Sequence, residues 1–158
     1  MPTLNKIKLL IIGVLLILTV SLVFSDQALP NNVELFMVKR LQEKVFMAVK
    51  KSPIDKINYY NILLDKRLGE FVSLVENKEY DYFYTASLRY ATTAGMFTQI
   101  IKTENFKNLD YQTRNKFKDH QQKIQNLYNS CLSQEDDRCK YVQDAYNYLA
   151  IYLDQLSN

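Results

Sequence analysis

The sequence predicts an all-α protein in which an N-terminal transmembrane or signal helix precedes an antiparallel bundle of about five helices. Its 158 residues include only three Gly and three Pro, which is too few turn-forming residues for a sheet of many strands. Residues 9–24 are apolar or small and uncharged. Beyond position 33, apolar residues recur at spacings of three and four, which is typical of amphipathic helices.

Residues 7–24 form the predicted membrane segment. As a helix, residues 9–24 would rise about 24 Å, slightly less than a hydrocarbon core of about 30 Å. Local thinning of the bilayer, or a Lys8 side chain that reaches the headgroups, compensates for such a difference. An uncleaved anchor is therefore the favoured interpretation. The alternative is a secretory signal cleaved near Ser25, because Val23 and Ser25 suit the positions before a cleavage site.

The expected orientation places the C-terminal part of the chain outside the cytoplasm. Lys6 and Lys8 precede the apolar segment, and the basic residues that follow it begin only at Lys39. Localisation is thus expected at the cell membrane as a single-pass protein, or outside the cell after cleavage. We divide the chain into a membrane segment (1–25), a connector (26–32) and a helical bundle domain (33–158).

The charge balance argues against a nucleic-acid partner. Two of the 20 Lys and Arg, Lys6 and Lys8, belong to the membrane segment, so the rest of the chain has 18 basic residues against 17 Asp and Glu and is nearly neutral. A nucleic-acid-binding surface needs a basic stripe that displaces counterions from phosphates. The sequence provides none.

The first two predicted helices cover about 33–50 and 53–75. Ser52 is placed to cap the second helix, with Pro53 at its first position and acidic Asp55 in its first turn. The apolar stripe of the first helix is expected to be Val38, Leu41, Val45 and Ala48. That of the second is expected to be Ile54, Ile57, Asn61, Leu64, Leu68, Phe71 and Val75.

Three further helices are predicted at about 79–103, 109–132 and 136–156. The short breaks between them require antiparallel turns. The expected stripe of the third helix is Tyr80, Tyr84, Leu88, Ala91, Gly95 and Thr98. The fourth is expected to bury Phe117, His120, Ile124, Leu127 and Cys131. The fifth is expected to bury Cys139, Val142, Tyr146, Leu149, either Tyr152 or Leu153, and Leu156.

The sequence contains no recognisable catalytic apparatus, and we expect no enzyme activity, cofactor or metal site. His120 is the single histidine, so it cannot form a multi-histidine metal site. It falls on an apolar stripe, where a hydrogen-bonded core histidine is the favoured interpretation. A P-loop, a nucleophile elbow and a zinc-spaced cysteine cluster are absent from the sequence.

Tyrosine is the unusual feature of the composition, with 12 Tyr and no Trp. Tyr80, Tyr82 and Tyr84 follow one another at alternate positions. Most tyrosines of a small helical domain lie at the edge of the core with their hydroxyl toward water. A helix with aromatic residues on every side cannot bury all of them, so these three are the best candidates for a partner-binding surface.

A resemblance to a known family rests on four short motifs in order. They are Leu29-Pro30, the Lys39-Arg40-x-x-Glu43 helix, Ser52-Pro53, and Arg67-Leu68-x-Glu70. Residues 28–100 thereby resemble a prokaryotic domain family of unknown function found in exported or membrane-anchored proteins. The resemblance implies an extracytoplasmic helical module beside a hydrophobic segment. The chain departs from the family in Gly69, where Ala is usual, and in the tyrosines of the third helix.

Arg67 and Glu70 of the last motif stand three positions apart, a spacing at which side chains on a helix can pair. A buried charge needs a partner, and Glu70 or Glu43 could supply it for Arg67. We favour structural pairing over a role in recognition.

The leading functional hypothesis is a non-catalytic domain that binds another exported protein or a component of the cell envelope. The alternative is a small-molecule sensor or carrier, in which Asn61, His120, Ala91 and Gly95 would line a cavity. A third class, the hydrolases, would require at least two titratable groups that converge near His120.

Cys131 and Cys139, the only cysteines, are predicted to form a disulfide. They stand near the end of one predicted helix and the start of the next, and a short antiparallel turn can bring such positions together. The alternative is a pair of reduced, buried thiols, since both residues lie on apolar stripes. Export favours the disulfide because oxidising compartments preserve it.

Overall fold

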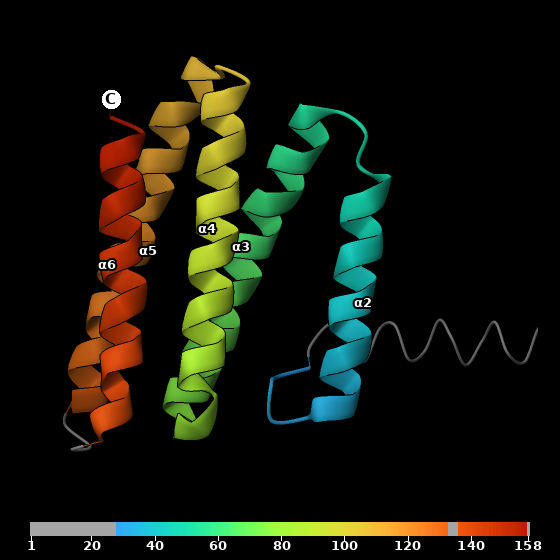
Figure 1. The fold of residues 1–158 in the computed structure, drawn as a ribbon. Helices are drawn as coiled ribbons and strands as arrows, with labels where there is room; N and C mark the ends of the chain where they lie inside the picture. The colour runs from blue at the N-terminus through green and yellow to red at the C-terminus, as the bar shows by residue number, and fades with distance from the viewer. Residues whose placement is uncertain (1–27, 133–135, 158) are drawn as a thin grey trace, which may run out of the picture. The chain divides into compact units, whose positions relative to one another are not determined.

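The computed structural model describes residues 28–132 and 136–157, and every regular element among them is a helix (Figure 1). The α-helices are α2 (Val33–Val49), α3 (Pro53–Glu76), α4 (Phe83–Thr103), α5 (Lys107–Leu132) and α6 (Lys140–Gln155), with short 3-10 helices η1 (Tyr80–Tyr82) and η2 (Asp137–Cys139). The predicted all-α fold with five helices is confirmed. The predicted membrane segment, residues 7–24, lies outside the described residues. None of the described helices is both long enough and apolar enough to cross a membrane.

The chain divides into two compact units, residues 1–49 and 50–158. This boundary differs from the expected one, which placed all of residues 33–158 in a single bundle domain. Helix α2 falls in the first unit, and Phe36 and Lys39 are its buried residues.

In the first unit, a turn leads directly into α2. The backbone N–H of Asn32 donates to the carbonyl of Leu29 (3.0 Å), and the Asn32 side chain accepts from the N–H of Leu35 (3.3 Å). Asn32 thus caps the helix. The buried ammonium of Lys39 donates to the carbonyl of Ala28 (3.1 Å), which holds the chain before the turn against the second turn of α2.

The stripe expected to be buried on α2 is exposed, so that prediction was wrong. Val38, Leu41, Val45 and Ala48 are all exposed, and Leu41 keeps 64 % of its surface. Helix α2 carries apolar residues on more than one side. Periodicity alone therefore could not identify the buried side of α2, which is the side that carries Phe36.

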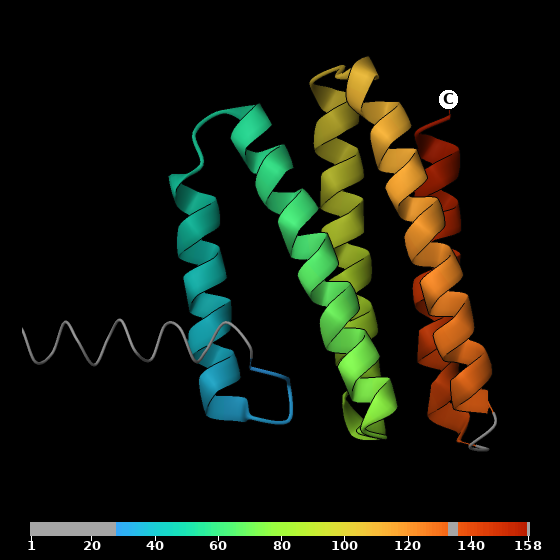
Figure 2. The ribbon, with the colours of Figure 1, turned by 180° about the vertical axis from the view of Figure 1, so that it is seen from behind.

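The second unit is a four-helix bundle (Figures 1 and 2). Helix α4 packs between α3 and α6, and α5 packs mainly against α6. Consecutive helices run antiparallel, so the neighbours α4 and α6 run parallel to each other. The contacts between α3 and α5 are fewer, which makes this the loosest side of the bundle. The fully buried apolar and aromatic side chains at the centre include Leu64, Phe71, Leu74, Phe83, Tyr90, Ile101, Phe117, Ile124, Val142 and Leu149.

The start of α3 is as predicted. Ser52 Oγ accepts from the backbone N–H of Asp55 (3.1 Å) and donates to the Asp55 carboxylate (2.6 Å), and Pro53 occupies the first turn. Such a cap typically contributes about 1 kcal/mol.

Helices α3 and α4 end in the same way. Lys78 (φ 58°) and Asn105 (φ 55°) adopt the left-handed conformation. The residue after each donates back to a helix carbonyl, Glu79 to Leu74 (2.9 Å) and Phe106 to Ile101 (3.1 Å). These bonds satisfy carbonyls that a helix end leaves unpaired, and they reverse the chain within a few residues.

The expected stripe of the third predicted helix was wrong in part: Ala91 and Thr98 are buried as expected, whereas Tyr84 and Leu88 are not. The continuous helix starts at Phe83, after the 3-10 turn, and Tyr84 and Leu88 are exposed. The buried row, at spacings of three and four, consists of Phe83, Ala86, Tyr90, Ala94, Phe97 and Ile101. The stripes expected on α5 and α6 are confirmed for Phe117, His120, Ile124, Cys131, Cys139, Val142, Leu149 and Leu156, all of which are buried.

Candidate functional site

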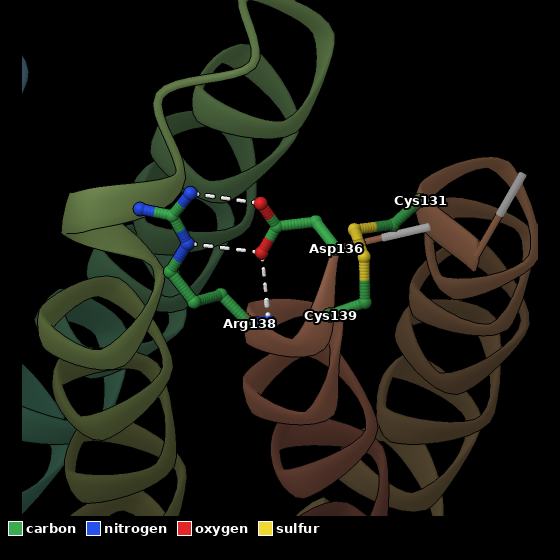
Figure 3. The surroundings of a disulfide bond; sticks show 4 residues. All are labelled: Cys131, Asp136, Arg138 and Cys139. Atoms are coloured by element: carbon green, nitrogen blue, oxygen red, sulfur yellow. Dashed lines mark hydrogen bonds and ion pairs between the residues drawn. A yellow bond between two sulfur atoms is a disulfide. The ribbon is translucent and has the colours of Figure 1, made fainter. Parts of the chain in front are cut away.

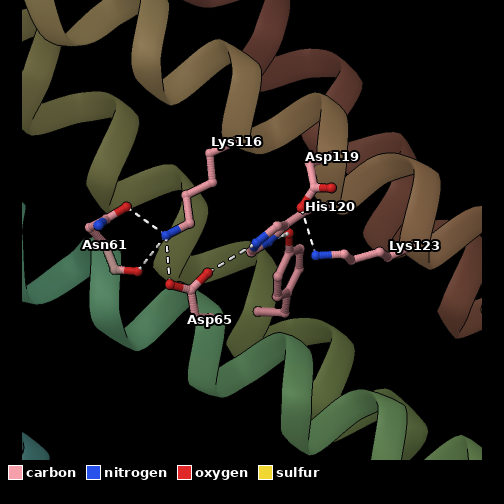
Figure 4. Close-up of polar contacts among 7 residues, drawn as sticks. Asn61, Asp65, Lys116, Asp119, His120 and Lys123 are labelled. Carbon is pink, nitrogen blue, oxygen red and sulfur yellow. Dashed lines mark hydrogen bonds and ion pairs between the residues drawn. The ribbon is translucent and has the colours of Figure 1, made fainter.

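A polar cluster joins α3 to α5 on the loosest side of the bundle. Figure 4 shows Lys116 and His120 of α5 directed toward Asn61 and Asp65 of α3. Lys116 Nζ donates to Asn61 Oδ1 (2.6 Å), to the Asn61 carbonyl (3.0 Å) and to Asp65 Oδ2 (2.7 Å). Asn61 was expected to be the polar member of a buried stripe. It is exposed instead, and its side chain and carbonyl accept hydrogen bonds from Lys116.

His120 is the centre of this cluster. Its Nε2 lies 3.1 Å from Asp65 Oδ1 and its Nδ1 lies 2.9 Å from the Tyr90 hydroxyl. The ring is buried, as is Tyr90, whereas Asp65 is exposed. The expectation of a hydrogen-bonded core histidine is confirmed.

Burial lowers the pKa of His120 below its usual value, Asp65 opposes this shift and Lys116 adds to it. Burial also raises the pKa of the Tyr90 hydroxyl far above its usual value. The buried histidine is therefore neutral near pH 7, and Tyr90 keeps its proton.

Titratable groups do converge on His120, which is the condition set above for a hydrolase. An acyl-transfer site would also need an accessible nucleophile beside the histidine. The hydroxyl that His120 contacts belongs to Tyr90, which has no exposed surface. In this cluster each ring nitrogen of His120 has a hydrogen-bond partner within the protein. The expectation that the chain is not an enzyme stays a prediction.

A second charged cluster contains the pair expected from the sequence motif. Arg67 Nη1 lies 2.7 Å from Glu70 Oε1, and Arg89 Nη1 of α4 lies 3.5 Å from Glu70 Oε2. Glu70 thus sits between two guanidinium groups and links α3 to α4. Arg67 and Glu70 are each 5 % exposed, which leaves little surface for recognition of a partner.

The predicted cysteine pair is present as a disulfide. Cys131 at the end of α5 and Cys139 in η2 are bonded, with Cα atoms 5.7 Å apart, inside the range of roughly 4.4 to 6.8 Å that disulfides accept. Both residues are buried. The bond ties the end of α5 to the start of α6.

An ion-pair cluster lies beside the disulfide (Figure 3). Arg138 holds Asp136 with two parallel bonds, Nε to Oδ1 (2.9 Å) and Nη2 to Oδ2 (2.8 Å). These bonds lower the pKa of Asp136 to about 2. Arg138 also pairs with Asp81 of η1 and lies over the Tyr80 ring, 4.9 Å from its centre. The arginine therefore fastens the α5–α6 turn to the 3-10 turn before α4.

The three tyrosines proposed as a partner-binding surface do not share one surface. Tyr80 and Tyr82 are partly buried against the core, and Tyr80 also packs on Phe83. Tyr84 alone is exposed, at 57 %. Tyr80 and Tyr82 belong to η1, whereas Tyr84 stands in the first turn of α4.

Tyr84 instead belongs to an apolar face that α4 and α6 share. We name the exposed residues Tyr84, Leu88, Tyr148 and Ile151 the α4–α6 face. The Tyr84 and Tyr141 rings meet edge to face across the two helices, with centroids 5.3 Å apart. Because the helices run parallel, helical positions 88, 148 and 151 lie on the outer side of the same seam.

Sequence reasoning missed Leu88, Tyr148 and Ile151 as surface residues. A signal was available for α6. Tyr141, Tyr148 and Tyr152 are spaced by seven and four, so they form a second row beside the core row of Val142 and Leu149.

The hollow beside Asn61 is small for the ligand of a sensor or carrier. A cavity of about 90 Å³ lies between α3, α4 and α5, lined by Ile57, Asn58, Asn61, Phe97, Leu109, Gln112 and Thr113. Ligand pockets usually measure about 300 to 1,000 Å³. Of the four residues expected to line a ligand cavity, Asn61 does so. His120 is bonded within the core, and the space beside Gly95 is filled by Tyr152.

No group of three or more metal-binding side chains occurs in the described part of the chain. No protein-family model, curated protein or solved structure matches the sequence. The resemblance to a prokaryotic domain family of unknown function therefore stays a prediction.

Proposed function

We propose that this chain is a non-catalytic, membrane-anchored helical domain that binds another exported protein or an envelope protein outside the cytoplasm. The observation that carries the proposal is the α4–α6 face. Four large apolar or aromatic side chains are exposed on two helices that pack side by side. Such contiguous patches mark interaction sites, and tyrosine is enriched where proteins meet.

The residues of the face are suited to binding a protein. Tyr84 and Tyr148 supply rigid amphipathic area that loses little conformational entropy on binding. Their rings are already oriented, since Tyr84 packs against Tyr141 and Tyr148 stacks on Tyr152 with centroids 6.4 Å apart.

The location outside the cytoplasm draws support from the disulfide. Disulfides persist in oxidising compartments and are rare in the cytosol. The uncharged segment at residues 7–24 accounts for membrane attachment, or for export if it is cleaved near Ser25. No cofactor, metal or nucleic acid enters the proposal.

Cross-linking in the cells that make this protein tests the proposal. A photoreactive phenylalanine analogue at position 88 should capture a protein partner, and the same analogue at position 111 of α5 should not. Tyr111 is a suitable control because it is 70 % exposed and lies outside the α4–α6 face.

Joint substitution of Tyr84→Ser and Tyr148→Ser should then abolish capture, whereas Tyr111→Ser should leave it unchanged. Helix content and the disulfide should be the same in both variants. Survival of every cross-link in the doubly substituted chain would show that another surface binds the partner.

A further inference from the structure

Helix α2 exposes one row of apolar side chains along its whole length. Val33, Met37, Leu41, Val45 and Val49 stand four residues apart, and each keeps between 53 % and 64 % of its surface exposed. Each step of four residues passes a full turn of the helix by about 40°, so the row winds slowly around α2 as it rises about 24 Å, and Met37, Leu41 and Val45 share one face. A continuous apolar strip of this length requires a covering surface.

The chain itself indicates which surface lies close by. The uncharged residues 9–24 end shortly before α2 begins, and the turn at residues 29–32 shortens the reach of the connector. Lys39 further holds the Ala28 carbonyl beside the second turn of α2. Only four residue steps separate Phe24 from Ala28, a span of at most about 14 Å. The start of α2 is therefore restricted to the neighbourhood of the membrane segment.

The charges of α2 and its surroundings fit a phospholipid surface. Arg40 and Lys44 are exposed on α2 beside one exposed acidic residue, Glu34, and Lys50 and Lys51 follow the helix directly. Helices that lie in a membrane interface combine an apolar face with basic residues that reach the phosphate groups.

We propose that α2 lies in the interfacial layer of the bilayer that holds residues 7–24, with the middle of the row, Met37, Leu41 and Val45, inserted toward the acyl chains. This inference rests on the membrane attachment in the proposed function. It assigns α2 to the lipid and leaves the α4–α6 face for the protein partner.

Tryptophan fluorescence provides the test, because the chain contains no Trp. Full-length Leu41→Trp protein is reconstituted in vesicles of phosphatidylcholine and phosphatidylglycerol, with or without phosphatidylcholine brominated on its acyl chains. Bromine quenches a tryptophan only at short range. Leu41→Trp should emit at shorter wavelength in vesicles and lose most of its fluorescence when the lipid is brominated.

Tyr111→Trp is the matched control, since that exposed position lies on α5 and should keep its fluorescence. Met37→Trp, on the same row as Leu41, repeats the test if Leu41→Trp misfolds. Equal fluorescence with and without bromine would overturn the inference. A shift to shorter wavelength without quenching would also overturn it, because protein would then cover the row.

Flotation of the same samples separates this inference from the proposed function. If the protein floats with the vesicles but Leu41→Trp is not quenched, the anchor stands and the inference fails. If the protein does not float, membrane attachment itself fails. Quenching of Leu41→Trp and Tyr111→Trp alike would show general adsorption and would contradict a specific role for α2.

Discussion

Nδ1 of His120 lies 2.9 Å from the hydroxyl oxygen of Tyr90, where both side chains are buried. The other ring nitrogen faces the Asp65 carboxylate, which can only accept a hydrogen bond. Nε2 must therefore carry the ring proton of the neutral histidine, and Nδ1 accepts from the Tyr90 hydroxyl. Protonation of the ring removes this acceptor, so the network depends on pH.

Acidification should destabilise the fold below about pH 6.5. The pKa of His120 is lower in the folded protein than its ordinary value of 6.5. Between those two values the unfolded chain binds more protons than the folded one, so the free energy of unfolding falls as the pH falls. The stability that neutral His120 contributes is fully lost once the pH is below the pKa of His120 in the folded protein.

Urea unfolding at a series of pH values from about 7 to about 5 measures this effect, in a window above the usual range of carboxylates. His120→Gln should show a flatter dependence. Because His120 is the only histidine, its imidazole signals in a proton NMR titration report its pKa directly. A midpoint at or above the ordinary value would contradict the prediction.

Asp65→Asn should lower the pKa of His120 further. The Asp65 charge raises that pKa through electrostatic attraction and a hydrogen bond. The amide oxygen of Asn can still accept from Nε2, so the substitution removes the charge and preserves an acceptor. The same NMR titration measures the shift. Asp144→Asn, at an exposed position on α6, should leave the midpoint unchanged, and an equal shift in both variants would argue against a direct effect of Asp65.

Tyr90→Phe should destabilise the bundle by about 1 to 3 kcal/mol, because it leaves Nδ1 of a buried imidazole without its donor. Chemical denaturation of the variant and the parent protein at neutral pH gives the difference. Tyr111→Phe removes a hydroxyl from an exposed side chain and should change stability very little. Similar losses in the two variants would mean that the Tyr90–His120 bond has no special importance.

The two glycines of the bundle should respond to alanine in opposite directions. An added Cβ at Gly69 of α3 meets nothing within 4 Å, so Gly69→Ala should stabilise the protein by about 0.5 to 1 kcal/mol through helix propensity. At Gly95 of α4 the Cβ would lie 2.7 Å from the Tyr152 hydroxyl. Gly95→Ala should therefore be destabilising, by about 1 to 3 kcal/mol.

Thermal unfolding of the two variants beside the parent protein tests this contrast. Tyr152→Phe removes the atom that clashes and should recover part of the loss when combined with Gly95→Ala. If Gly95→Ala is as stable as Gly69→Ala, the α4–α6 contact at this position must be loose.

The sequence was sufficient to predict the elements whose signals are local. Few Gly and Pro residues, and a Ser-Pro-x-Asp start for α3, identify helices without reference to the rest of the chain. On α5 the apolar residues are few and fall on one side, so Phe117, His120 and Ile124 could be assigned to the core. Helix α4 has aromatic residues on several sides. Its periodicity was therefore ambiguous, and Tyr84 was chosen where Phe83 is buried.

The polar network could not be predicted, because its members are far apart in sequence. Asp65 and His120 are separated by 55 residues, and Tyr90 and His120 by 30. A hydrogen bond between side chains leaves no periodic pattern, and the register of α4 decides whether Tyr90 faces inward. By contrast, Cys131 and Cys139 are only eight positions apart on the two sides of a predicted turn, so their proximity followed from local structure.

The disulfide between Cys131 and Cys139 should stabilise the folded protein by about 2.5 kcal/mol, because it closes a short loop and restricts the unfolded chain. Urea unfolding of the parent protein against the Cys131→Ala and Cys139→Ala double variant measures the difference. Alanine avoids a buried unpaired hydroxyl at positions without exposed surface. The same bond reports location, since thiols in a reducing cytosol stay free. Protein isolated from its own cells under denaturing conditions should take up an alkylating reagent at both cysteines after reduction and at neither before. Two thiols that react without reductant would contradict both the bond in the native protein and the placement of this domain outside the cytoplasm.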